Sequence, residues 1–184
     1  GDIQPGDVFA INDPYRGGTH LNDVSFIRPI FIDDEIIGFA QNKGHWADIG
    51  GNVPGSFDVN ASTHFSEGLR ITPVRVWQQG RFLHDVAQLL VSNTRAPAQA
   101  MGDLQAQAEA TAVCEREILR LVEKYSKATV VAAMQETQDY VERIVLKSLA
   151  DMPKGEWETV DYIDADPALG EGMVPIRIKL KLDG

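Results

Sequence analysis

Two short motifs bring histidine and aspartate close together in the sequence. The first contains His20 and Asp23, and the second contains His45 and Asp48, so each His is followed three residues later by an Asp. This density is unusual in a chain with four histidines. Neutral imidazole nitrogen and carboxylate oxygen suit Zn²⁺, Mn²⁺ or Fe²⁺. The motifs therefore indicate a divalent metal site with His20, Asp23 and His45 as ligands, and a three-ligand site keeps an open position for catalysis.

Other polar residues near the motifs are candidates for supporting roles. Asp48 could be a fourth ligand, orient an imidazole or relay protons. His64 lies in a long loop with Glu67 and is a candidate acid/base group. Arg16 and Lys43 flank the two motifs, where each could bind a carboxylate or phosphate group.

A purely structural interpretation stays open beside the metal site. Asp13, Asp23 and Asp48 would then cap turns, and the histidines would hydrogen-bond the backbone. Spacing alone does not decide, because neither motif has the specificity of paired Cys-x2-Cys motifs. His84, beside Asp85 at the start of a predicted helix, is expected to be solvated and outside the site.

A β-hairpin is the element that must position the motifs. Residues 24–32 and 35–41 are apolar segments on either side of Asp33-Asp34, with Pro29 marking an edge position or a bulge. The far ends of this hairpin carry both motifs, so His45 is expected beside the first motif. Residues three apart on a strand point to opposite faces, so His20 and Asp23 also need a turn or loop.

The remaining segments predict an α+β fold. We expect a strand at 8–11, an irregular segment at 49–69, a strand at 71–77, a helix at 83–93, two amphipathic helices between 101 and 152, and strands at 157–163 and 176–182. A break near residues 125–127 would fold the two long helices into an antiparallel hairpin. This divides the chain into a β-rich metal-site region (1–82), a helical region (83–153) and the start of a further β region (154–184).

Composition excludes several classes of function. The chain has 17 Lys and Arg against 27 Asp and Glu, a formal charge of −10, which disfavours non-specific binding to nucleic acid or anionic membranes. One cysteine, Cys114, cannot form an internal disulfide. The sequence has no membrane-length apolar run and no signal-peptide pattern, so a cytoplasmic location is expected. Both ends look cut, which suggests a fragment of a larger subunit.

The sequence resembles the hydantoinase B/oxoprolinase family in the segments at residues 6–9, 12–23, 44–51, 67–74 and 102–107. That family includes B subunits of ATP-dependent N-methylhydantoinases, the corresponding half of 5-oxoprolinase, and subunits of acetone and acetophenone carboxylases. In the related carboxylases a divalent metal is held by a His, an Asp three residues later and a second His. The resemblance places these roles on His20, Asp23 and His45. Trp46 departs from the family, where many members carry a second consecutive His, and so argues against a two-metal site.

The resemblance implies a metal-containing subunit of an ATP-dependent hydrolase that acts on cyclic amides of the hydantoin or 5-oxoproline type. ATP would be handled by a hydantoinase A-type partner in a hetero-oligomer, consistent with the lack of a phosphate-binding loop in this sequence. The chain alone is expected to be inactive. The alternatives are a subunit of an acetone/acetophenone-type carboxylase, a non-haem Fe(II) oxygenase with a two-His, one-carboxylate triad, and a non-catalytic assembly module whose helices bind a partner.

Overall fold

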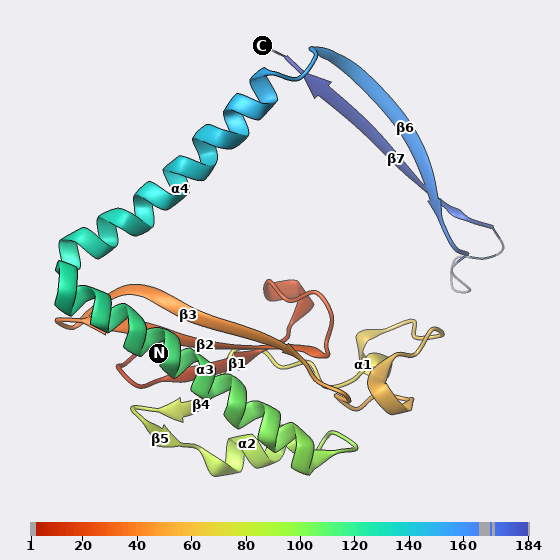
Figure 1. The fold of residues 1–184 in the computed structure, drawn as a ribbon. Coiled ribbons are helices and arrows are strands. Elements are labelled where there is room, and N and C mark those ends of the chain that lie inside the picture. The colour runs from red at the N-terminus through yellow and green to blue at the C-terminus, as the bar shows by residue number, and fades with distance from the viewer. Residues whose placement is uncertain (1–2, 166–169, 171, 184) are drawn as a thin grey trace. The chain divides into compact units, whose positions relative to one another are not determined.

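The computed structural model describes residues 3–165, 170 and 172–183, and the chain divides into two compact units, Gly1–Lys127 and Ala128–Gly184. The helices and strands of the first unit are β1 (Val8–Ile11), η1 (Pro14–Arg16), β2 (Asp23–Ile32), β3 (Glu35–His45), η2 (Pro54–Ser56), α1 (His64–Glu67), β4 (Val74–Gln78), β5 (Arg81–Phe82), α2 (His84–Val91) and α3 (Pro97–Tyr125). Its five strands form one antiparallel sheet in the order β3-β2-β1-β4-β5 (Figure 1). The predicted α+β class is confirmed.

The predicted hairpin is confirmed as β2 and β3. Asp33 and Asp34 connect the strands and both adopt left-handed backbone conformations, with φ of 51° and 63°, as a tight two-residue hairpin loop requires. Pro29 lies beyond the part of β2 that pairs with β1 and next to a register shift at Ile30/Phe31. It therefore sits where the ladder tolerates a residue without an N–H.

Several boundaries differ from those predicted. Strand β3 continues past residue 41 to His45, and β4 begins at Val74 rather than at residue 71. The helix predicted at 83–93 is shorter, and the irregular segment at 49–69 contains η2 and α1. Helix α3 packs against β2 and β3, and α2 packs against β4, so both helices belong to the same compact unit as the sheet.

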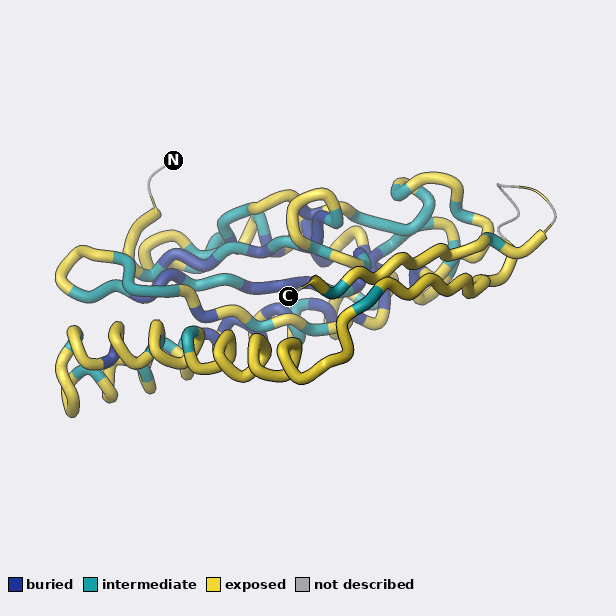
Figure 2. Tube along the Cα trace, turned by 90° about the horizontal axis from the view of Figure 1, so that it is seen from above, coloured by how far each residue is buried: buried dark blue, intermediate teal, exposed yellow. Residues whose placement is uncertain are grey.

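The core of the first unit lies between the sheet and these two helices. Alternate residues of the strands, such as Val24 and Phe26, are buried there together with Leu104 of α3 and Leu90 of α2. Figure 2 shows the buried segments concentrated in the strands and in the first part of α3. Asp23 and His45, at the open end of β2 and β3, lie on the opposite face of the sheet from Val24.

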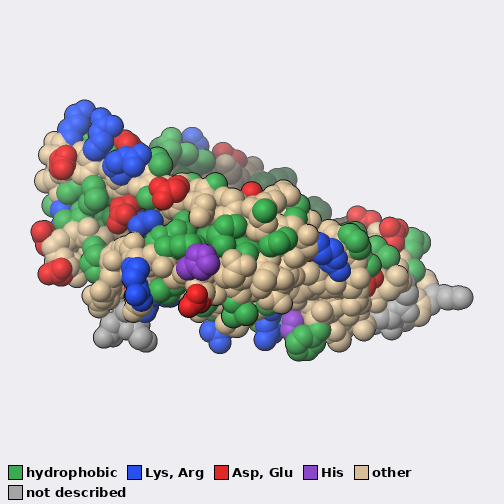
Figure 3. All heavy atoms as spheres, turned by 90° about the horizontal axis from the view of Figure 1, so that it is seen from below, with side chains coloured by type: hydrophobic (Ala, Val, Ile, Leu, Met, Phe, Trp, Pro, Cys, Tyr) green, Lys and Arg blue, Asp and Glu red, His purple; other side chains and the backbone are tan. Residues whose placement is uncertain are grey.

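The second unit contains all of α4 (Lys127–Ala150) except its first residue, together with β6 (Gly155–Ile163) and β7 (Val174–Leu182), and the two strands pair in antiparallel register. The two predicted C-terminal strands are therefore confirmed. Trp157 opposes Leu180 on one face of this hairpin, whereas Glu158 opposes Lys179 on the other. On the face of the whole molecule shown in Figure 3, hydrophobic side chains lie among charged ones.

The long helices break where predicted, at Ser126, which has a φ of 76° between α3 and α4. Antiparallel packing of α3 against α4 would depend on how the two units sit relative to each other, so this packing stays a prediction. None of the described helices is long and apolar enough to cross a membrane.

Candidate functional site

The register of β2 and β3 brings the two histidine motifs together. Asp23 and His45 are directly paired at the open end of the hairpin, and Asp23 Oδ1 lies 2.9 Å from His45 Nδ1. His20 lies in the turn before β2, where the Asp23 backbone N–H donates to the His20 carbonyl at 2.9 Å. The rings of His20 and His45 stack with centroids 5.4 Å apart. The structure therefore clusters the three predicted ligands.

The arrangement has suitable donor chemistry but not the geometry of a formed metal centre. Within residues 3–165, 170 and 172–183, no group of three His, Cys, Asp or Glu side chains is placed to hold a metal ion. One reason is that Asp23 faces His45 Nδ1. If that nitrogen carries the proton, Nε2 of His45 remains available to a metal. The metal site stays a prediction, which needs the side chains of His20 and Asp23 to turn towards a common point.

Two buried asparagines hold the first motif in place. Asn12 Nδ2 donates to the carbonyls of Leu21 at 2.6 Å and Leu69 at 2.9 Å, while its Oδ1 accepts the Ile71 N–H at 2.6 Å. Asn22 Nδ2 donates to the Trp46 carbonyl at 2.9 Å, which ties the first motif to the second. Sequence reasoning missed these roles. The only signal was the position of each Asn beside a motif residue.

Trp46 lies in the core, on the other side of the strand from His45. Its ring is 1% exposed, and its Nε1 donates to Gln107 Oε1 on α3 at 2.7 Å. Gln107 Nε2 in turn donates to the Val24 carbonyl at 2.9 Å and to Asn42 Oδ1 at 3.0 Å. Because a side chain at position 46 points away from His45, a second His there would join the core network rather than the site.

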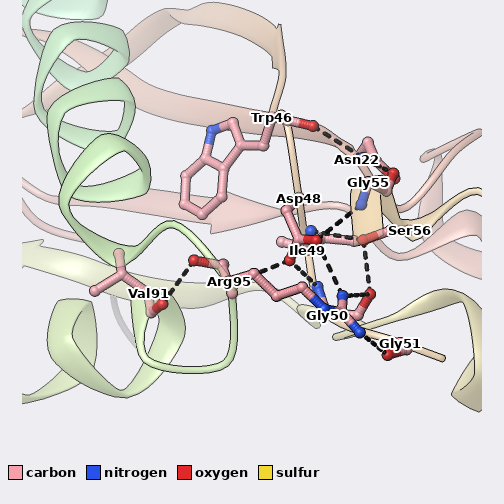
Figure 4. Close-up of polar contacts among 11 residues, drawn as sticks. Asn22, Trp46, Asp48, Ile49, Gly50, Gly51, Gly55, Ser56, Val91 and Arg95 are labelled. Atoms are coloured by element: carbon pink, nitrogen blue, oxygen red, sulfur yellow. Dashed lines mark hydrogen bonds and ion pairs between the residues drawn. The ribbon is translucent and has the colours of Figure 1, made fainter. Parts of the chain in front are cut away.

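Asp48 braces the loop after β3 (Figure 4). Its Oδ1 accepts the N–H groups of Gly50 and Arg95, both at 2.9 Å, and its Oδ2 accepts the Gly55 N–H and Arg95 Nη1, both at 3.0 Å. Burial alone would raise the pKa of this carboxyl, but the hydrogen bonds from the Arg95, Gly50 and Gly55 backbone and from the Arg95 side chain together lower it. These four bonds favour a structural role over proton relay.

The structure places the other predicted site residues on β3, η1 and α1. Lys43 is exposed and two residues before His45 on β3, so it lies on the same face of the sheet. Arg16 ends η1 and pairs with Asp13 at 3.8 Å. His64 and Glu67 are the first and last residues of α1, and the His64 ring lies 6.3 Å from that of Tyr15.

Comparisons with known proteins identify a family and several relatives to which this chain is similar. The family model described as Hydantoinase B/oxoprolinase matches residues 1–184. The beta subunit of the caprolactamase of Pseudomonas jessenii is 37% identical over 99% of this chain, and the B-type subunit of a putative D-/L-hydantoinase of Pseudomonas sp. (strain NS671) is 35% identical over 97%. The chain spans 32% and 31% of these relatives, respectively.

The solved structures include a similar fold. The crystal structure of the ATP-dependent caprolactamase from Pseudomonas jessenii superposes with a TM-score of 0.93 at 36% identity, covering 100% of this chain and 31% of that one. The architecture described above is thus shared with an enzyme chain about three times as long. Since the family model matches the whole sequence, the chain belongs to the hydantoinase B/oxoprolinase family.

Proposed function

We propose that this chain is part of a subunit of an ATP-dependent cyclic-amide hydrolase of the hydantoinase, oxoprolinase and caprolactamase type. Support comes from its family and from the two relatives, which are named as a beta subunit and a B-type subunit. Those names also support assembly with a second subunit. The sequence has no Gly-x4-Gly-Lys-Ser/Thr loop, so we assign ATP use to a hydantoinase A-type partner.

We further propose His20, Asp23 and His45 as the protein ligands of a divalent zinc, manganese or iron ion. The observation that carries this proposal is the hairpin register, which pairs Asp23 with His45 and leaves the His20 ring 5.4 Å from that of His45. Two imidazoles and one carboxylate are a suitable donor set for such an ion. When bound, it would polarise a substrate carbonyl or lower the pKa of a coordinated water.

The chain's own residues would hold and orient the reactants at this site. In this structure Asp23 orients the His45 ring through Nδ1, and as a metal ligand its carboxylate would turn from that nitrogen towards the ion. The His45 side chain is 62% exposed, which leaves room for a substrate to approach. Lys43, on the same face, would attract an anionic group. His64 and Glu67 remain the acid/base candidates, with His64 half-buried at the start of α1.

The test uses the intact subunit assembled with its ATP-using partner. We expect His20→Ala and His45→Ala to remove the bound metal, measured by elemental analysis, and ATP-dependent hydrolysis of caprolactam, hydantoin or 5-oxoproline. His84→Ala is the matched control, because its side chain is 71% exposed at the start of α2. Circular dichroism spectra of all variants should match that of the wild type.

Each alternative function has its own outcome in these assays. Full metal content in both ligand variants would refute the metal site. Unaltered turnover in those variants would instead favour a non-catalytic assembly module. Bicarbonate-dependent consumption of a ketone would indicate a carboxylase, and oxygen uptake without ATP would indicate a non-haem iron oxygenase.

A further inference from the structure

A buried carboxylate in the segment that precedes the first histidine motif lies at ion-pair distance from two arginines. Asp13 has a side chain that is 4% exposed, and its Oδ2 lies 3.8 Å from Arg16 Nε and 4.0 Å from Arg70 Nε. The side chain of Arg16 is 65% exposed and that of Arg70 is 36% exposed. Arg70 follows the long loop and was not among the residues predicted from the sequence. The fold thus joins two guanidinium groups that are far apart in the chain.

The charges of this cluster do not cancel. One carboxylate faces two guanidinium groups, so the three side chains carry one excess positive charge in a chain whose formal charge is −10. Asp13 Oδ1 is already used, because it accepts the Tyr15 N–H at 3.0 Å. Each guanidinium has five N–H donors, and one carboxylate at ion-pair distance cannot satisfy both sets. The remaining donors can bind an additional anion.

The two arginines lie close to the proposed catalytic residues. Arg16 and His20 are four positions apart, so their Cα atoms are separated by at most roughly 14 Å. Arg70 stacks on the Tyr15 ring at 5.7 Å, and the same ring meets His64 at 6.3 Å. A ligand at the arginines is therefore within a small molecule's reach of the loop that carries His20.

Exposed aromatic rings border this region. Tyr15 is 75% exposed, and Phe57 is 73% exposed with its ring 6.3 Å from that of His20. Such rings can cover the apolar part of a small substrate while nearby cations bind its charged end. The arrangement is typical of a ligand site that combines a few polar anchors with apolar walls.

We propose that Arg16 and Arg70, anchored by Asp13, form an oxyanion-binding subsite beside His20, Asp23 and His45. The group bound is a phosphoryl or a carboxylate group of a small molecule. Amide hydrolysis releases a carboxylate and ATP supplies a phosphoryl group, so this assignment of the source depends on the proposed function. Binding of the oxyanion itself does not depend on it, because guanidinium forks match either group.

The test measures anion binding on the intact subunit without its partner or ATP. Metal is removed first with a chelator, so that the probe cannot bind to an ion. Inorganic phosphate and acetate are titrated separately by calorimetry at constant ionic strength, because screening weakens such contacts. We expect binding of phosphate, acetate or both, and the stronger ligand identifies the chemical source.

Variants at the arginines decide whether this subsite is the one that binds. Arg16→Gln and Arg70→Gln should each weaken binding about tenfold, because each removes charge-assisted hydrogen bonds to the anion. Arg70→Lys should lose less, since it keeps the charge. Arg81→Gln is the matched control, as Arg81 is an exposed arginine on β5. His45→Ala should also leave binding unchanged.

The possible failures can be told apart. Binding of neither ion, or equal affinity in the wild type and both Gln variants, would overturn the subsite. Loss of metal and turnover in His45→Ala with retained anion binding would support both proposals. Retained turnover in His45→Ala would contradict the proposed metal centre and favour the non-catalytic assembly module, whereas the arginine variants alone decide the anion subsite.

Discussion

The substitution Asp48→Asn tests the brace that holds the second motif. Each carboxylate oxygen of Asp48 accepts two N–H groups. An asparagine can keep one acceptor oxygen towards Gly50 and the Arg95 backbone. Its NH₂ group would then face the Gly55 N–H and the Arg95 guanidinium, both of which are donors. Two hydrogen bonds to a charged acceptor are lost and two donors lose their partner.

The magnitude follows from the number of contacts removed. A hydrogen bond to a charged group contributes about 1.5–3 kcal/mol, and the two lost bonds are in a site where Asp48 is 7% exposed. We therefore expect the free energy of unfolding of the first unit to fall by about 3–5 kcal/mol. Asp58→Asn is the control in the same loop, because Asp58 Oδ2 accepts from the exposed Asn52 side chain and an asparagine oxygen can keep the Asn60 N–H that Oδ1 accepts.

The loss should depend on pH in one direction. The pKa of Asp48 is lowered in the folded protein, so its stabilisation is fully present above the unfolded pKa of about 3.9 and is lost as pH falls through the folded pKa. The difference in unfolding free energy between wild type and Asp48→Asn should be constant from pH 7 to about pH 5 and shrink below about pH 4.

Urea denaturation followed by tryptophan fluorescence and circular dichroism measures this difference, with buried Trp46 reporting on the first unit. A difference below about 1 kcal/mol at pH 7 would show that the four contacts do not act as a brace. A difference that grows on acidification would contradict the sign of the pKa shift.

Two further predictions concern the hairpin that carries the site. Gly44→Ala should lower the free energy of unfolding by about 1–3 kcal/mol in urea denaturation, because the new Cβ would lie 2.7 Å from the Gln107 side chain. Gly38→Ala on the same strand meets nothing within 4 Å and should cost less than half as much, so equal losses would contradict the steric argument. Asp34→Gly should raise the midpoint temperature of thermal unfolding, with a gain of roughly 0.5–1 kcal/mol, because Asp34 has a φ of 63° that glycine adopts without strain. A lower midpoint would show that the Asp34 side chain makes a larger contribution than its backbone strain costs.

The parts of the fold that the sequence predicted are those fixed by local pattern. Alternating apolar residues and the Asp33-Asp34 turn specify β2 and β3 without help from distant residues. Once the hairpin is known, counting residues outward from the turn pairs Asp23 with Gly44, and the register shift at Ile30/Phe31 moves this pairing by one residue to His45. The proximity of the two histidine motifs was therefore predictable to within one residue, although the contact spans 22 residues.

The parts that were missed depend on contacts between distant segments. Strand β3 extends through the polar stretch after Gln41 as far as His45. In that stretch, Gln107 of α3 donates a hydrogen bond to the Asn42 side chain. Position 71 looked like the start of a strand, but the Ile71 N–H is taken by the Asn12 side chain. The partner of Asp48, Arg95, lies 47 residues away and nothing near Asp48 indicates it. Local patterns carry no information about such side-chain pairs.

The distribution of burial around the site determines how its variants should be interpreted. The residues that brace the site, Asn12, Asp48 and Gln107, are all at least 92% buried and bound to backbone groups of other segments. His45, in contrast, is mostly exposed, and its side-chain contacts are the Asp23 carboxylate and the His20 ring. Replacing His45 therefore removes little that holds the fold together, so a loss of metal or turnover reports on chemistry. Replacing one of the three bracing residues changes both the stability of the fold and the geometry of the site. A fractional loss of activity in such a variant is therefore informative only when it is larger than the fraction of unfolded protein measured in the same sample.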